Sequence, residues 1–365
     1  MLSDSHGRVA TDLRVSLTDR CNLRCQYCMP AEGLDWLPKA GLLTDDEVVR
    51  LIRIGVQRLG ITEVRFTGGE PLLRRGLTAI VAQTAALRPR PEISLTTNGI
   101  GLSRLAGPLH AAGLDRVNVS LDTLRPETFR ALARRDRLSD VLDGMAAAAA
   151  TGLAPVKVNT VLMRGLNDEE AVPLARFCLE RGYQLRFIEQ MPLDAQHGWR
   201  RDGMVTADEI LAALSAEFSL TPDDPQARGS APAEVFLVDG GPARIGVIGS
   251  VTRPFCGSCD RVRLTADGQV RNCLFARQES DLRTQMRGGG PGHPVRHVTR
   301  QVEHGPHIRH VLADPKLRAD RRGPVVELAH GGSPRVARDG LTPHLRGNLE
   351  AGVCHRRVND ISLAI

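Results

Sequence analysis

Residues 13–28 read LRVSLTDRCNLRCQYC, a short apolar run that passes directly into a polar loop with three cysteines. The run Leu13–Leu17 is the length of a strand and rich in apolar and β-branched residues, which is typical of a buried β-strand. The three cysteines therefore follow the carboxyl end of the first predicted strand. Parallel α/β proteins collect their functional groups at that end, so this stretch bears on both fold and site.

The same order of strand and helix repeats to about residue 190. The strand candidates are Leu13–Leu17, Glu63–Thr67, Ile93–Thr97, Val117–Leu121, Val156–Val161 and Leu185–Glu189. Thr44 and Glu47 have the spacing of a capping box that starts the first helix, and Gly60 is expected to end it. Similar helix starts are predicted at Asn167 and Thr206. Six βα units predict an α/β fold, either an open twisted sheet or a partial barrel.

The chain divides into three predicted parts, which are residues 1–190, 191–288 and 289–365. The second part has a loop-rich connection with one helix, and then two short strands that flank the Gly240-Gly241 turn. Residues 284–365 contain no Phe, Tyr or Trp and hold 8 of the 11 histidines. This composition predicts a poorly ordered, atypical tail.

Composition excludes several classes of protein. Of 365 residues, 42% are hydrophobic and 25% charged, as in ordinary globular proteins, and no apolar run is long enough to span a membrane. The N-terminus lacks the pattern of a signal peptide, so a cytoplasmic location is expected. The net charge of +6 lies entirely in residues 284–365, because residues 1–283 hold 35 basic and 35 acidic residues. A neutral body without interleaved aromatic residues argues against nucleic-acid binding.

Six of the eight cysteines fall into two triplets, which are Cys21, Cys25, Cys28 and Cys256, Cys259, Cys273. In a reducing compartment, such clustering indicates metal ligation before disulfide formation. Cys178 lies between apolar residues in a helical pattern and is predicted to be a plain core cysteine.

The first triplet has the spacing C-x3-C-x2-C. Three thiolates can hold a cubane iron–sulfur cluster while leaving one iron open for another ligand. Zinc with a distant fourth ligand, or a chance grouping, remains an alternative, although no histidine lies between His6 and His110.

The second triplet has the spacing C-x2-C-x13-C, which on its own fits a structural zinc site. No histidine lies between residues 198 and 292 to complete a zinc tetrahedron. A second cluster with an open iron is therefore the other interpretation.

Three features together resemble the radical S-adenosylmethionine superfamily. They are the C-x3-C-x2-C triplet, the aromatic Tyr27 before its last cysteine, and Gly68-Gly69-Glu70-Pro71 after the second strand. Within that superfamily the chain is similar to the GTP 3′,8-cyclase family over residues 8–288. The segments that carry this likeness are Thr18–Cys21, Cys28–Pro30, Arg65–Leu72, Thr96–Gly99, Asn118–Asp122, Lys157–Asn159 and Cys259–Leu264, with the second triplet.

The resemblance implies a fold, cofactors and a reaction. The fold is a partial (βα)6 TIM-like barrel with a C-terminal cluster-binding extension. The cofactors are two [4Fe–4S] clusters, one held by each cysteine triplet, and S-adenosylmethionine. The first cluster reduces the sulfonium, and the resulting 5′-deoxyadenosyl radical removes the C3′ hydrogen of GTP. The sugar radical then attacks C8 of guanine, in the first step of molybdenum cofactor biosynthesis.

The resemblance also implies two sets of binding residues. The S-adenosylmethionine contacts are Tyr27, Gly69, Ser120 and Met191, and the GTP contacts are Arg14, Arg65, Thr96, Lys157, Arg261 and Arg263. Five of the six GTP residues are cationic, as a triphosphate requires. Lys157 shares one face of its predicted strand with Asn159, which favours a role in the site.

The implied partners are GTP, a downstream cyclic pyranopterin monophosphate synthase, an electron donor such as flavodoxin or ferredoxin, and a second copy of the chain in a homodimer. The tail departs from the family after Arg283, and Gly331-Gly332 lies 33 residues before the end of the chain. A frameshift, a sequencing error and a lineage-specific tail all stay open. The alternative function is a catalytically impaired paralogue that binds clusters, S-adenosylmethionine and GTP, and the third interpretation is another radical enzyme, such as one that modifies peptides.

Overall fold

The computed structural model describes residues 1–4, 7–224, 228–276 and 279–288. The tail predicted from residue 289 onward, and its disorder, lie outside the described residues. None of the helices in the described ranges is long and apolar enough to cross a bilayer.

Among the described residues, twelve strands form one mixed sheet in the order β14-β13-β12-β3-β4-β5-β6-β7-β8-β11-β10-β9. The strands are β3 (Asp12–Ser16), β4 (Glu63–Thr67), β5 (Glu92–Thr97), β6 (Arg116–Ser120), β7 (Lys157–Val161), β8 (Gln184–Ile188), β9 (Leu220–Pro222), β10 (Glu234–Val238), β11 (Arg244–Ile248), β12 (Arg261–Leu264), β13 (Gln269–Arg271) and β14 (Ser280–Asp281). A separate hairpin pairs β1 (Leu2–Ser3) with β2 (Val9–Ala10). All six strands predicted up to residue 190 are present within one residue of the expected limits.

The sheet is parallel from β12 to β11, and the parallel part is longer than the six predicted strands. β12 pairs in parallel with β3, and β11 pairs in parallel with β8. Both added strands come from the region after residue 191, so the C-terminal part of the chain extends the first sheet at its two ends. Local sequence patterns did not reveal these pairings, because β12 and β3 lie about 250 residues apart and β11 and β8 about 60 residues apart.

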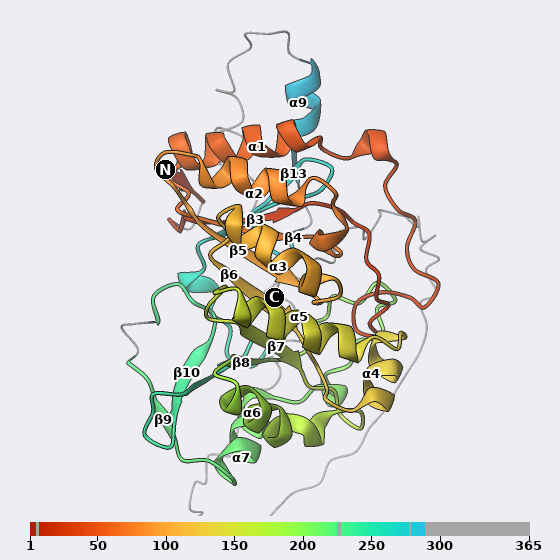
Figure 1. The fold of residues 1–365 in the computed structure, drawn as a ribbon, viewed down its shortest axis with the longest axis vertical. Helices are drawn as coiled ribbons and strands as arrows, with labels where there is room; N and C mark the ends of the chain where they lie inside the picture. The colour runs from red at the N-terminus through yellow and green to blue at the C-terminus, as the bar shows by residue number, and fades with distance from the viewer. Residues whose placement is uncertain (5–6, 225–227, 277–278, 289–365) are drawn as a thin grey trace, which may run out of the picture. The chain divides into compact units, whose positions relative to one another are not determined.

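Helices cover one face of the sheet, as Figure 1 shows for α1, α2, α3, α5 and α6. The helices are α1 (Asp45–Ile54), α2 (Leu77–Ala85), α3 (Leu102–Ala111), α4 (Pro126–Ala133), α5 (Leu138–Ala150), α6 (Ala171–Glu180), α7 (Ala207–Ser215) and α9 (Leu282–Gly288). Short helical turns are η1 (Lys39–Gly41), η2 (Gly55–Leu59), η3 (Pro71–Leu73), η4 (Asp168–Glu170), η5 (Arg201–Gly203) and η6 (Cys256–Ser258).

Helical residues follow all three predicted helix starts, and the side-chain capping contact is present at two of them. Thr44 and Thr206 both form capping boxes, with Glu47 and Glu209 respectively. Gly60 ends the π turn that follows α1, with φ 85°. A helical turn also begins directly after Asn167 and runs into α6, but the Asn167 side chain makes no cap and instead donates to the carbonyl oxygens of residues 122 and 161. The amide group satisfies backbone groups of two loops, a tertiary role that a local motif does not indicate.

The two faces of the parallel strands differ sharply in chemistry. Positions that face the helices are apolar and buried, for example Val15, Phe66 and Val119, all 0% exposed, and they form the main core. Cys178 is 0% exposed in α6 and belongs to this core, as predicted. The alternate positions face away from the helices, and we call them the polar face. It consists of Asp12, Arg14, Ser16, Glu63, Arg65, Thr67, Ser94, Thr96, Arg116, Asn118, Ser120, Lys157, Asn159, Arg186, Arg261 and Arg263.

Candidate active site

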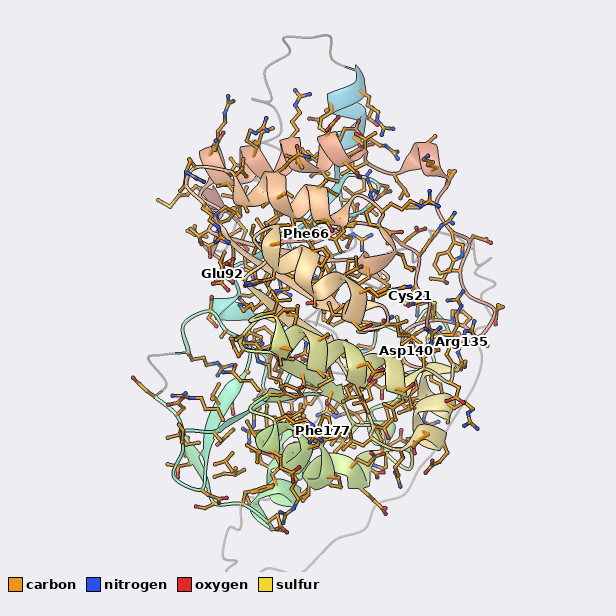
Figure 2. The ribbon with its side chains drawn as sticks, in the orientation of Figure 1. Cys21, Phe66, Glu92, Arg135, Asp140 and Phe177 are labelled. Carbon is orange, nitrogen blue, oxygen red and sulfur yellow. The ribbon has the colours of Figure 1, made fainter. Side chains whose placement is uncertain are left out.

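The first cysteine triplet lies in the loop after β3 and is buried. Cys21 and Cys25 are each 8% exposed and Cys28 is 4% exposed. Figure 2 labels Cys21 at one end of the strands and Glu92, the first residue of β5, at the other, so the triplet lies at the carboxyl end as predicted. The loop is fixed to the end of α4, because the backbone N–H of Arg24 donates to Ala133 O at 3.0 Å.

Burial and mutual repulsion raise the pKa values of these thiols. Burial raises the pKa of Cys21 to about 11 and that of Cys28 to about 12. Burial and then the neighbouring Cys28 raise the pKa of Cys25. Three thiols that perturb one another form a close group, and as thiolates they would need a strongly positive partner such as iron.

The backbone of the Gly68-Gly69 turn is hydrogen-bonded directly to the backbone of the cysteine loop. The N–H of Gly69 donates to Thr18 O at 2.7 Å, and the N–H of Glu70 donates to Arg20 O at 2.7 Å. Gly68 has φ 143°, which side chains rarely adopt. A Cβ at Gly69 would meet the Asp19 carbonyl oxygen at 2.5 Å and the Arg20 carbonyl oxygen even closer. Both glycines are therefore required for the two loops to lie against each other.

Glu70 connects this turn to a third loop. It is 0% exposed and accepts hydrogen bonds from Thr97 Oγ1 and the Asn98 N–H, both at 2.7 Å. Burial raises the pKa of Glu70 to about 7. The Asn98 amide donates to Asn22 Oδ1 at 2.7 Å and lies 3.8 Å from Cys21 Sγ. No local pattern assigns a role to Glu70 or Asn98, because these residues hold together loops from three strands.

The four residues expected to contact S-adenosylmethionine all lie at or beyond strand ends. Tyr27 donates its hydroxyl to Asp122 Oδ2 at 2.8 Å, just after β6. Burial raises the pKa of Asp122 to about 6. Ser120 is the last residue of β6, Gly69 follows β4, and Met191 follows β8. The structure thus brings all four to the same edge of the sheet as the first triplet.

The six residues expected to contact GTP all lie on the polar face. Arg263, Arg14 and Arg65 are direct neighbours across β12, β3 and β4. Thr96 and Lys157 lie on either side of Asn118 in the next row, across β5, β6 and β7. Arg261 pairs with Asp12 on β3. The register of the sheet therefore gathers into one surface residues that are spread over 250 positions of sequence.

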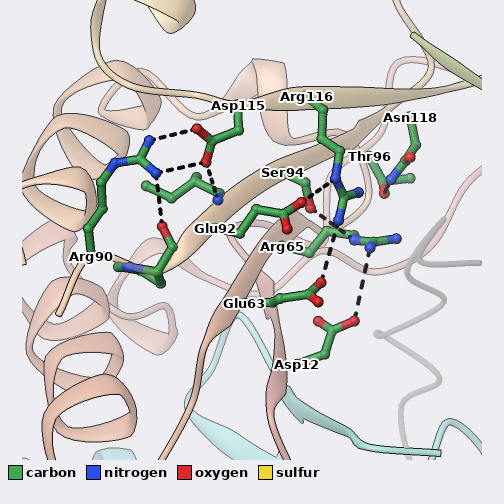
Figure 3. Close-up of polar contacts among 12 residues, drawn as sticks. Asp12, Glu63, Arg65, Arg90, Glu92, Ser94, Thr96, Asp115, Arg116 and Asn118 are labelled. Atoms are coloured by element: carbon green, nitrogen blue, oxygen red, sulfur yellow. Dashed lines mark hydrogen bonds and ion pairs between the residues drawn. The ribbon is translucent and has the colours of Figure 1, made fainter. Parts of the chain in front are cut away.

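Asp12 orients two of these arginines. Its carboxylate accepts from Arg14 Nε at 3.0 and 3.1 Å and forms an ion pair with Arg14 Nη2 at 2.9 Å. Arg65 Nη2 lies 4.0 Å from Asp12 Oδ2, while Arg65 Nε donates to Ser94 Oγ at 3.1 Å, as Figure 3 shows. Burial tends to raise the pKa of Asp12, but the two arginines outweigh it and lower the pKa.

The cations of the polar face have fewer acidic partners than their number requires. Burial and neighbouring cations lower the pKa of Lys157 to about 7, that of Arg263 to about 9 and that of Arg186 to about 10. Arg14 Nη1 and Arg261 Nη2 are buried and make no hydrogen bond within the described part of the chain. Buried donors without acceptors are costly, so this surface is suited to a polyanion.

Two cations of this surface, Arg116 and Arg186, were missed. Arg186 lies between Leu185 and Phe187, which face the helices, and strand alternation alone would have placed it on the polar face. Arg116 is held by Glu63 and Glu92 at the amino end of the strands.

The second cysteine triplet lies beside the polar face but is more open. Cys256 is exposed, and Cys259 and Cys273 are partly buried. Burial, followed by Cys273 and Cys259, raises the pKa of Cys256, so these thiols are also close neighbours. Arg8, after the N-terminal hairpin turn, donates to Cys256 O at 3.0 Å.

Both triplets offer thiols alone, which is the ligand chemistry of an iron–sulfur cluster. Within the described ranges, no three His, Cys, Asp or Glu side chains converge to hold a single metal ion. Three thiols at each site fit a cluster with one open iron, in which each thiolate binds a different iron atom.

Comparisons with known proteins agree with these features. Residues 15–178 match the Radical SAM superfamily and residues 183–305 match Molybdenum Cofactor Synthesis C. A GTP 3′,8-cyclase of Streptomyces coelicolor is 65% identical over 315 residues, which are 86% of this chain and 92% of that protein. A GTP 3′,8-cyclase 2 of Mycobacterium tuberculosis is 64% identical over 292 residues, which are 79% of this chain and 81% of that protein.

Among solved structures, Streptococcus suis SuiB bound to S-adenosylmethionine matches with a TM-score of 0.54 at 13% identity. The match covers 75% of this chain and 63% of that chain, and at this identity it is a likeness of fold. The expected partial TIM-like barrel is the fold observed, with β11 and β12 added to its six predicted strands. On the identity and coverage of its relatives, the chain belongs to the GTP 3′,8-cyclase family of the radical S-adenosylmethionine superfamily.

Proposed function

We propose that this chain is a radical S-adenosylmethionine lyase that converts GTP to (8S)-3′,8-cyclo-7,8-dihydroguanosine 5′-triphosphate in molybdenum cofactor biosynthesis. One juxtaposition supports the proposal most. The loop that carries the buried thiol triplet is hydrogen-bonded through its backbone to the Gly-Gly turn, at the edge of the same sheet whose polar face gathers arginines and a lysine. The first group suits a cluster and its cosubstrate, and the second suits a nucleoside triphosphate.

In this proposal the two triplets hold two [4Fe–4S] clusters, with Cys21, Cys25 and Cys28 on the first and Cys256, Cys259 and Cys273 on the second. When bound, the first cluster and S-adenosylmethionine supply the one-electron chemistry that starts the reaction. The chain orients the cosubstrate through Tyr27, Gly69, Ser120 and Met191. The buried loops around Glu70 and Asn98 keep water away from that edge of the sheet.

The polar face binds the substrate. Arg14, Arg65, Arg261 and Arg263 hold the triphosphate, and Thr96 and Lys157, one row nearer the carboxyl ends of the strands, contact the same nucleotide. Arg186 adds to the positive charge of this face, because it lies beside Asn159 and its pKa is lowered by burial and by neighbouring cations. A triphosphate would supply acceptors for the unpartnered Arg14 and Arg261 nitrogens and relieve repulsion among the cations.

The remaining parts of the proposal come from the family rather than from contacts. The product passes to a cyclic pyranopterin monophosphate synthase, and a flavodoxin or ferredoxin supplies electrons. We propose a cytoplasmic homodimer.

The decisive experiment is an anaerobic assay of the reconstituted full chain with GTP, S-adenosylmethionine and a reductant. The proposal expects methionine, 5′-deoxyadenosine and a cyclised nucleotide of the mass of GTP. A chimera in which residues after 288 come from the Streptomyces coelicolor relative serves as the matched control. Cyclised product from the chimera alone would favour the impaired paralogue, and cleavage without product from either would contradict the proposed function.

A further inference from the structure

The side chain of Asn118 has an unexplained position in the middle of the polar face. It is 0% exposed, and its Nδ2 donates to Thr96 Oγ1 at 3.2 Å, a contact drawn in Figure 3. Its Oδ1 is buried and accepts no hydrogen bond within the described part of the chain. Leaving an amide oxygen buried without a donor is costly, so a ligand donor is the natural explanation.

The chemistry of this oxygen restricts which part of a nucleotide can meet it. Phosphate oxygens are acceptors and cannot satisfy another acceptor. Ribose hydroxyls donate, as do the N–H groups of guanine. A nucleotide group that satisfies Asn118 Oδ1 therefore has to belong to the nucleoside and not to the triphosphate.

The position along β6 selects the sugar. Arg116, Asn118 and Ser120 follow one another on the same face, each step spanning about 6.6 Å. In the proposed function, Ser120 contacts S-adenosylmethionine, and Arg65, one row toward the amino ends, contacts phosphate. The reacting C3′ has to lie between the phosphates and the cosubstrate, which is the level of Asn118.

We propose that Asn118 is a specificity-determining residue whose side-chain oxygen accepts a hydrogen bond from a ribose hydroxyl of the substrate. Thr96 holds the amide in place so that the oxygen is presented before the nucleotide arrives. The residue thereby distinguishes ribonucleotides from nucleotides that lack one hydroxyl. This inference rests on the proposed function, since it takes GTP as the ligand.

The test compares binding of GTP, 2′-deoxy-GTP and 3′-deoxy-GTP to the reconstituted full chain by calorimetry, without turnover. The unchanged protein should bind one deoxy analogue about fivefold to tenfold more weakly than GTP. In Asn118→Leu that ratio should fall to about one. In Asn118→Asp, which keeps an acceptor, all three nucleotides should bind more weakly because of the added negative charge, but the ratio should persist.

Ser94→Ala is the matched control, because Ser94 contacts Arg65 on the neighbouring strand and not Asn118. It should weaken all three nucleotides by a similar factor and leave the ratio unchanged. Equal binding of GTP and both analogues by the unchanged protein would overturn the inference without any variant. An unchanged affinity ratio in Asn118→Leu would also overturn the inference. That result is expected if Asn118 Oδ1 accepts its hydrogen bond from Lys157 and not from the ribose. Absence of GTP binding to the unchanged protein would instead overturn the proposed function, and this inference with it.

Discussion

The two cysteine triplets contain the same ligands in different surroundings. The first is nearly inaccessible and is bonded to the Gly-Gly turn, to α4 and to the loop after β5. The second lies in η6 and beside β12 and β13, with Cys256 exposed and its carbonyl oxygen accepting from Arg8 and from the Cys259 N–H. Ligand chemistry alone therefore does not separate the two sites. Their packing does: the first is enclosed against water, and the second opens beside the cations of the polar face.

The largest expected effect comes from replacing one cysteine in each triplet. If the two variants cleaved S-adenosylmethionine equally well, the two triplets would not differ in function as they do in packing. Cys25→Ser should abolish cleavage of S-adenosylmethionine, whereas Cys259→Ser should keep it. Each change should lower the iron content from about eight to about four per chain, because a cubane cluster holds four irons. Iron analysis and quantified 5′-deoxyadenosine check this. Stoichiometric zinc without iron at the second triplet would show that the two sites differ in metal as well as in packing.

The arginines next to the second triplet provide the next largest effect. Arg261→Ala or Arg263→Ala should weaken GTP binding roughly 10- to 150-fold, as expected for loss of a charge-assisted hydrogen bond of about 1.5–3 kcal/mol. Cleavage of S-adenosylmethionine should remain, because neither residue contacts the first triplet's loops. Arg137→Ala, which removes an exposed arginine paired with Asp140, controls for net charge. Unchanged GTP affinity in both site variants would remove β12 from the binding surface.

One glycine near each triplet tests the difference in packing directly. Gly69→Ala should destabilise the fold by about 1–3 kcal/mol and reduce cleavage of S-adenosylmethionine, because the new methyl group would collide with backbone oxygens of the cysteine loop. Gly257→Ala should be nearly neutral, because a Cβ at Gly257 meets no atom within 4 Å. Thermal unfolding of the two variants makes the comparison, and similar melting temperatures would contradict it.

The smallest expected effect concerns the contact between α9 in the C-terminal region and α1 in the N-terminal region. Arg287 in α9 pairs with Glu47 of the α1 capping box at 2.7 Å. The hydrogen bond from Arg287 lowers the pKa of Glu47 from 4.5 to about 2. Because the folded-state pKa is lowered, the contact stabilises the protein above pH 4.5 and loses its effect as the pH falls toward 2.

Arg287→Ala should therefore cost only about 0.2–1 kcal/mol near neutral pH, as is usual for a surface ion pair, and should flatten the acid limb of the stability curve. Hydrogen exchange over residues 282–288 should increase while the cysteine loop keeps its protection. An equal loss of protection in both regions would mean that they unfold together.

Sequence reasoning succeeded where the signal was local. The six strands, two capping boxes and both triplets follow from neighbouring residues, and the expected site residues all reach the strand ends or the polar face. It failed where the partner was distant. Asn167 precedes a helical turn as expected, but its amide binds backbone oxygens 6 and 45 residues away and does not cap that turn. The pairing of β12 with β3 depends on sheet register. The contact of Asp12 with Arg14, two residues apart on β3, and the overlooked Arg186 were both available from strand alternation.

The crowding of cations on the polar face affects the stability of the ligand-free protein and therefore its resistance to proteolysis in the cell. Lys157 lies within the field of Arg186, and Arg263 within that of Arg14 and Arg261, so the ligand-free chain carries repulsion among these cations. Any polyanion that binds only the native state stabilises it by mass action. We expect the empty protein to be the form that proteases remove first, so that its abundance follows the supply of nucleotide as well as the rate of its synthesis.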